Sequence, residues 1–172
     1  MTQAVLVVED EAVFAKNIQT YLVREGFEVR IAGDANAAMS EFEAFRPGIV
    51  LLDYNLPGAD GLEVLSRMRA KDSKVPVIML TGHGSVEVAV QAMKSGAADY
   101  LSKPVALGEL KLVINRVMQR EQIEGALAYY QKAADTKQPT AFMAMASHYL
   151  KKRESSKALK VPLSALVREG ED

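Results

Sequence analysis

The chain has 172 residues, and its 21 Lys and Arg against 22 Asp and Glu leave a formal net charge of −1. With 49% hydrophobic and 25% charged residues it has the composition of an ordinary globular protein, which excludes a disordered chain, a fibre or a polybasic coat. It has no Cys and only two His, which excludes a disulfide scaffold, a Cys–zinc site, thiol catalysis and a His-rich metal site. No apolar run approaches the roughly 20 residues that span a bilayer, and the N-terminus lacks the basic segment of a signal peptide. We therefore expect a cytoplasmic protein that makes no membrane contact.

Five short apolar runs alternate with longer segments of helical spacing. The runs are Ala4–Val8, Val29–Ala32, Ile49–Leu52, Val77–Leu80 and Tyr100–Leu101. The expected helices are Glu11–Glu25, Asp34–Phe45, Asp60–Ala70, Val86–Ser95 and a last one from Ala106 onward. Because the runs are apolar at consecutive positions, both faces of each strand should be covered, as crossover helices cover a parallel sheet. The pattern predicts a doubly wound α/β domain with a five-stranded parallel sheet.

Polar residues follow four of the five runs. They stand in the segments Glu9–Glu11, Asp53–Asn55, Thr81–Gly82 and Ser102–Pro104. Ligands of doubly wound domains bind outside the carboxyl ends of the strands, where these segments should meet. Exposed loops are often polar, but that explains poorly a set that combines clustered acids with one Lys and one Thr.

The chemistry of this set favours a phosphoryl group. Clustered carboxylates repel one another, so a hard cation is the expected neutraliser, and oxygen ligands without His or Cys favour Mg²⁺. Lys103 adds a positive charge and Thr81 a hydroxyl donor, and both suit phosphoryl oxygens. Asp53 is then the natural carboxylate nucleophile, because an aspartyl phosphate is an established covalent species.

Four motifs carry a family resemblance over residues 1–120. They are Val7–Glu11, Leu51–Gly61, Leu80–Ser85 and Asp99–Pro104. In this order and at this spacing they resemble the receiver domain of bacterial two-component response regulators. The stretch Gly82–Met93 is similar to receivers of the nitrogen-regulator, enhancer-binding class.

The resemblance implies a flavodoxin-like sheet of strand order 2-1-3-4-5 and phosphorylation of Asp53 by a sensor histidine kinase. It implies Mg²⁺ held by Asp10, Asp53 and the main chain of Asn55. Glu9 would act through a metal-bound water, at a position where many receivers have Asp. The bond before Pro104 is usually cis in this family.

The resemblance also implies a switch. Phosphoryl capture draws the Thr81 hydroxyl inward beside Lys103, and Tyr100 turns into the space vacated. The face of the fourth helix, fifth strand and fifth helix then changes its partners, with a homodimer as one outcome. His83, two residues after Thr81, is a candidate for tuning hydrolysis of the acyl phosphate. The chain is then no enzyme in the usual sense, but a phosphoacceptor that catalyses its own phosphoryl transfer and slow self-hydrolysis.

Residues 121–172 form a second segment, expected to be a helical linker or extension of unknown role. It is too short for the ATPase domain of the enhancer-binding class. The last receiver helix continues into this segment, where it either pairs with a second copy or folds back on the receiver. A basic cluster within residues 151–166 suggests DNA contact only weakly, because a DNA-binding domain usually shows a stronger basic stripe.

Of two alternatives to a phosphorylated transcriptional regulator, the first stays open and the second is disfavoured. A receiver fold that binds partners without phosphorylation stays open, although the intact set of Asp10, Asp53, Thr81 and Lys103 argues against it. An aspartate-nucleophile phosphatase needs a second Asp two residues after the nucleophile. Asn55 stands there and cannot deliver a proton.

Overall fold

The computed structural model describes residues 3–82 and 86–135. Five of its strands form one parallel sheet: β1 (Ala4–Val8), β2 (Glu28–Ala32), β3 (Ile49–Asp53), β6 (Val77–Thr81) and β7 (Asp99–Ser102). The helices are α1 (Ala12–Arg24), α2 (Ala35–Phe45), α3 (Gly61–Lys71), α4 (Val86–Lys94) and α5 (Leu107–Asp135). The predicted elements are all present, with ends that differ by one or two residues where both are described.

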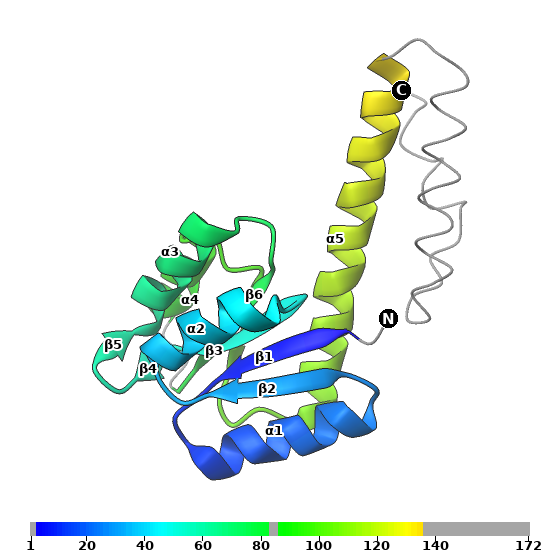
Figure 1. Cartoon of the computed structure of the whole chain (residues 1–172). Coiled ribbons are helices and arrows are strands. Elements are labelled where there is room, and N and C mark those ends of the chain that lie inside the picture. The colour runs from blue at the N-terminus through cyan, green and yellow to red at the C-terminus, as the bar shows by residue number, and fades with distance from the viewer. Residues whose placement is uncertain (1–2, 83–85, 136–172) are drawn as a thin grey trace. The chain divides into compact units, whose positions relative to one another are not determined.

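The sheet has the order β2-β1-β3-β6-β7 (Figure 1). Counted within the sheet, this is the predicted order 2-1-3-4-5, which is therefore confirmed. The register places Val8 opposite both Ala32 and Leu52, and Thr81 opposite Ser102. All four strand ends that the sequence singled out consequently reach the same edge of the sheet.

Two short strands were not predicted. β4 (Asn55–Leu56) and β5 (Ala59–Asp60) pair antiparallel directly after β3. Gly58 lies between them with φ +69°, a left-handed conformation that glycine adopts without a steric penalty. The hairpin folds the chain back over the end of β3 before α3 begins.

Alternation along the buried strands divides the core into two layers. One layer contains Leu6, Val50 and Met79, packed with α2, α3 and Ala92 of α4. The intervening strand residues face the other side, where Figure 1 shows α1 and the first turns of α5. All five residues of β3 and all five of β6 are buried, as strands covered on both faces should be.

Local signals account for the helix ends. The carboxylates of Asp34 and Asp60 accept hydrogen bonds from the N–H groups of Ala37 and Leu62, so each caps its helix. Gly26 follows α1 with φ +92°, the left-handed residue that often terminates a helix. The Lys103–Pro104 bond is cis.

Thr2–Val117 make one compact unit, and α5 runs on past it to Asp135. The predicted division at residue 120 into a receiver and an extension stays a prediction. Within the described residues, no helix combines the length and the hydrophobicity that a membrane crossing requires.

Candidate functional site

Four strand ends bring the predicted site residues together. Glu9 directly follows β1, Asp53 ends β3, Thr81 ends β6, and Lys103 directly follows β7. Glu9, Asp53 and Thr81 are 2%, 3% and 3% exposed, and they are the only buried polar or charged residues in the described part of the chain. The burial of polar groups is thus concentrated at the edge where the motifs meet.

Lys103 links the two buried carboxylates. Its Nζ lies 2.6 Å from Oε2 of Glu9 and 2.8 Å from Oδ2 of Asp53. The Lys103 N–H donates to the Thr81 carbonyl at 2.7 Å, which fixes the backbone from which this side chain extends. The Lys103 side chain remains 21% exposed, so the ammonium stands at the mouth of the site.

The second oxygen of each buried carboxylate accepts a main-chain hydrogen bond. Oε1 of Glu9 accepts from the N–H of Glu11 at 3.1 Å, and Oδ1 of Asp53 accepts from the N–H of Asn55 at 3.1 Å. Each carboxylate therefore has one oxygen on the backbone and one on Lys103. Such full pairing keeps a buried charge from being strongly destabilising.

Asp10 adds a third carboxylate, and it is exposed. One oxygen from each of Glu9, Asp10 and Asp53 lies within 4.8 Å of the other two. With Lys103 the group has a formal charge of −2, so a divalent cation would neutralise it. An all-oxygen set of few carboxylates, open to water at Asp10, fits the donor preference of Mg²⁺.

Burial and pairing shift two pKa values. Removal from water raises the pKa of Glu9 above its usual value, and the nearby charge of Asp53 adds to this, while hydrogen bonds from Lys103 and the Glu11 N–H oppose it. For Lys103, burial is the largest single effect and lowers the pKa. The hydrogen bonds and charges of Asp53 and Glu9 together outweigh it, so the Lys103 pKa is raised and the ammonium stays charged.

Gly61 allows the chain to close over the phosphoacceptor candidate. Its N–H donates to the Tyr54 carbonyl at 2.8 Å. A Cβ added at Gly61 would lie 2.5 Å from the Asp53 carbonyl oxygen and 2.7 Å from Cα of Tyr54, both backbone atoms that cannot turn aside. Only glycine fits here, which the sequence did not reveal.

Residues 5–115 match the response regulator receiver domain family. The chain belongs to this family. The receiver is 33% identical over 132 residues to the regulatory protein AtoC of Escherichia coli K12, an alignment that covers 77% of this chain and 29% of AtoC. It is 43% identical over 117 residues to the sensory transduction protein RegX3 of Mycolicibacterium smegmatis, covering 68% of this chain and 51% of RegX3.

Solved structures give the same picture. A CheY-like receiver domain protein from Methanospirillum hungatei superposes with a TM-score of 0.69 at 28% identity, covering 72% of this chain and 99% of that chain. NtrX from Brucella abortus in complex with ADP gives a TM-score of 0.71 at 34% identity, covering 75% of this chain and 30% of NtrX. The nitrogen-regulator likeness is therefore borne out, and the matched region is a minor part of NtrX.

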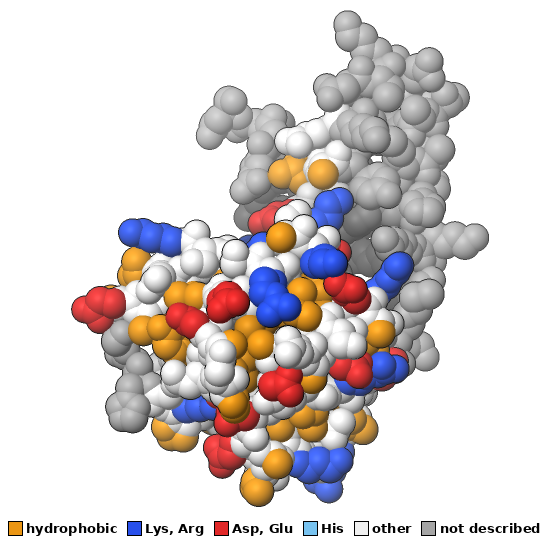
Figure 2. Space-filling view, turned by 60° about the vertical axis from the view of Figure 1, so that its left-hand side comes forward, with side chains coloured by type: hydrophobic (Ala, Val, Ile, Leu, Met, Phe, Trp, Pro, Cys, Tyr) orange, Lys and Arg blue, Asp and Glu red, His pale blue; other side chains and the backbone are white. Residues whose placement is uncertain are grey.

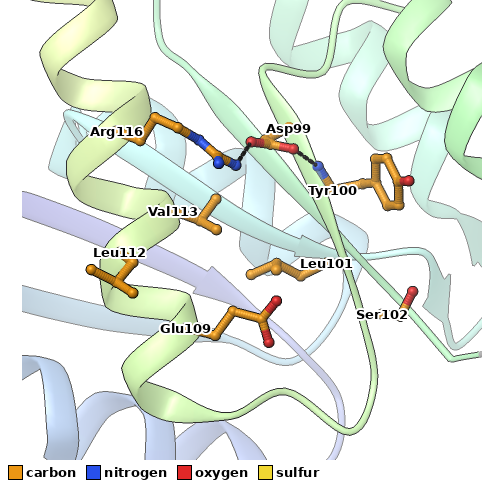
Figure 3. A pocket seen from close by; sticks show the side chains of 8 residues that line it. All are labelled: Asp99, Tyr100, Leu101, Ser102, Glu109, Leu112, Val113 and Arg116. Carbon is orange, nitrogen blue, oxygen red and sulfur yellow. Dashed lines mark hydrogen bonds and ion pairs between the residues drawn. The ribbon is translucent and has the colours of Figure 1, made fainter.

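The predicted switch residues Thr81 and Tyr100 lie on the neighbouring strands β6 and β7. The buried Thr81 hydroxyl donates a long hydrogen bond to the Leu101 carbonyl, at 3.5 Å. Tyr100 is 42% exposed, and Figure 3 shows its ring pointing away from α5. His83 and residues 151–166 lie outside the described residues, so the structure does not bear on their predicted roles.

The receiver also has a polar hollow that the sequence did not indicate. Its volume is about 550 Å³, between β7 and the first turns of α5, and Figure 3 shows the side chains that line it. At one end Arg116 pairs with Asp99 at 2.6 Å, and Figure 3 shows Glu109 and Ser102 toward the other end. Leu112, on α5 between Arg116 and Glu109, is 71% exposed. On the face drawn in Figure 2, acidic, basic and hydrophobic side chains are interspersed rather than gathered into one field.

Proposed function

We propose that Asp53 accepts a phosphoryl group from a phosphohistidine of a sensor histidine kinase. The carboxylate oxygen of Asp53 forms the new bond to phosphorus, and the bond from phosphorus to the histidine nitrogen breaks. The observation that carries the proposal is the ion pair of Lys103 with Asp53, inside a cluster of three carboxylates. Titratable groups that are buried together with a specific charge partner are concentrated at functional sites, which supports this role for Asp53.

We assign Mg²⁺ to the acidic cluster. Asp10 and Asp53 would supply side-chain oxygens, the main chain of Asn55 a further oxygen, and Glu9 would act through a bound water. An ion bound there would neutralise negative charge that develops on the phosphoryl oxygens. The fit rests on the oxygen-only donors and on the −2 charge that Lys103 leaves uncompensated.

Lys103 and Thr81 then act on the phosphoryl group itself. Lys103 exchanges its carboxylate partners for a phosphoryl oxygen, and the Thr81 hydroxyl donates to another. Tyr100 is proposed to turn inward as Thr81 moves. The α4–β7–α5 face, which is the predicted face of fourth helix, fifth strand and fifth helix, would thereby change its preference for partners.

Catalysis of its own phosphorylation and slow self-hydrolysis belong to the same proposal. Asn55 offers no acid to a leaving group, which keeps hydrolysis slow, and His83 is a candidate for tuning it. We place this activity in the cytoplasm, where a kinase with phosphohistidine would meet the receiver.

For the output we propose a change of dimerisation or partner binding in transcriptional control. Relatives with this receiver include the transcriptional regulatory protein FixJ of Bradyrhizobium diazoefficiens, of which the chain covers 58%. Exposed Val90, Met93 and Leu112 supply apolar surface on α4 and α5 for a homodimer. The continued α5 helix is the second candidate for pairing, and DNA contact by residues 151–166 is the weakest.

The test is the intact mass of the full chain after incubation with Mg²⁺ and acetyl phosphate. Asp53→Asn and a sample with EDTA are run beside it, and Asp34→Asn serves as a matched control for an Asp outside the site. Size exclusion before and after reports assembly.

We expect one phosphoryl adduct that requires both Mg²⁺ and Asp53 and that Asp34→Asn still forms. An adduct in Asp53→Asn at the wild-type level would contradict the assignment. Absence of any adduct from folded, Mg²⁺-treated protein would favour the phosphorylation-independent interaction module.

A further inference from the structure

Phe14 is the one aromatic side chain that the described structure places over the site lysine. It lies in the first turn of α1, and its ring centroid is 5.0 Å from Nζ of Lys103. A cation within about 6 Å of a ring centroid is attracted by the negative face of the ring. The sequence offered no sign of this contact, because Phe14 and Lys103 belong to elements at opposite ends of the receiver.

The other partners of Lys103 must change during the proposed reaction. Its ammonium now sits between Glu9 and Asp53, at 2.6 and 2.8 Å. When the Glu9 and Asp53 oxygens instead interact with a cation and bond to phosphorus, Lys103 loses both ion pairs. Its side chain is a flexible four-carbon stem, and it would have many orientations open to it.

The ring of Phe14 is carried by a helix that packs on the core. The helix that carries it is anchored by Ala15, Ile18 and Leu22, each with no exposed surface. Phe14 itself is half-buried, whereas its neighbour Val13 is 70% exposed. The ring thus extends from a packed helix and lies beside the ammonium, at the edge of the site.

We propose that Phe14 is a positioning residue for Lys103, holding the ammonium at the site while it passes from the carboxylates to the phosphoryl group. The inference rests on the proposed function. It assigns to α1 a part in phosphoryl transfer that does not depend on touching the substrate.

The experiment compares variants of the full chain in two measurements. The first is the rate of the acetyl phosphate adduct at Asp53 for wild type, Phe14→Leu, Phe14→Tyr and the neighbouring control Val13→Ala. The second is a double-mutant cycle on the unfolding equilibrium constant in EDTA, combining Phe14→Leu with Lys103→Met. Methionine keeps an apolar stem but removes the ammonium, so the cycle reports the contact of ring and charge.

We expect Phe14→Leu to slow adduct formation by about two- to fivefold, the size of an ordinary cation–π contact. Phe14→Tyr, which keeps the ring, and Val13→Ala should stay within about twofold of wild type. In the cycle, Phe14→Leu should raise the unfolding constant about two- to fivefold more in wild type than in Lys103→Met.

Three results would overturn the inference. If wild type forms the adduct and Phe14→Leu forms it at the same rate, the inference is overturned and the proposed function still holds. A slower rate with an equal effect of Phe14→Leu in both Lys103 backgrounds also overturns it, because the ring then acts through general packing. No adduct from wild type overturns the proposed function, and this inference with it.

Discussion

The acidic cluster should make the metal-free protein less stable than a variant with one carboxylate fewer. Asp10→Asn is the informative change, because Asp10 is exposed and Asn keeps nearly the same shape. It removes one negative charge from a group of three carboxylates and one ammonium. Glu9 and Asp53 keep their hydrogen bonds to Lys103 and to the backbone.

The magnitude follows from the spacing. The three ligand oxygens lie within 4.8 Å of one another. At that distance two unit charges repel by about 0.9 kcal/mol at the dielectric constant of water, which is the appropriate limit for exposed Asp10. Two such neighbours give about 1.7 kcal/mol, and the attraction to Lys103 that is lost reduces the net gain in unfolding free energy to about 1 kcal/mol.

Urea unfolding of both proteins in EDTA and in Mg²⁺ measures this difference. In EDTA, Asp10→Asn should be the more stable protein by about 1 kcal/mol. Adding Mg²⁺ to about ten times its dissociation constant should stabilise wild type by about 1.4 kcal/mol and the variant far less, since the variant lacks a proposed ligand. The difference in unfolding free energy between the two proteins therefore narrows when the ion is added, or wild type becomes the more stable.

Glu28→Gln is the matched control, because Glu28 is an exposed acid at the opposite end of the sheet. It should change stability little and leave the gain from Mg²⁺ intact. The reasoning is refuted if Asp10→Asn is less stable than wild type in EDTA, or if it gains as much from Mg²⁺ as wild type does.

Variants at three further positions test the framework around the site by urea unfolding. Gly61→Ala should lower the unfolding free energy by about 1–3 kcal/mol, because its Cβ meets backbone that cannot yield; an unchanged midpoint would mean that the turn relaxes freely. Asp34→Ala removes the cap on the Ala37 N–H and should cost about 1 kcal/mol, whereas Asp34→Ser should recover most of it. Arg69→Met removes hydrogen bonds to the carbonyls of Gly96 and Val75, at 3.0 and 2.6 Å, and should cost about 1–3 kcal/mol. A loss below about 0.3 kcal/mol would show that water replaces the guanidinium there.

Much of the architecture could be predicted from the amino-acid sequence alone. Runs such as Ile49–Leu52 are apolar at consecutive positions, and the structure buries every one of these residues. Asp34, Asp60 and Gly26 mark helix ends through contacts that span only a few residues. These signals are local, so a single sequence carries them in full, and the receiver motifs added the strand order that the sheet confirms.

The site could be predicted as a set of residues but not as an arrangement. Knowing that strand ends meet at one edge brings Glu9, Asp53, Thr81 and Lys103 together. It does not say that one ammonium lies between two carboxylates 94 and 50 residues away in the chain. Their roles in phosphoryl transfer stay predictions until the adduct is measured.

Tertiary structure alone decided the remaining contacts. The ring of Phe14 over Lys103, the pair of Arg116 with Asp99 and the close approach of Gly61 to the Asp53 carbonyl are all absent from any local pattern. Each contact depends on how the crossover helices pack against the sheet, and on which rotamers the neighbouring side chains allow. Sequence periodicity determines which face a residue occupies, whereas the distance across that face is set only when the whole core is packed.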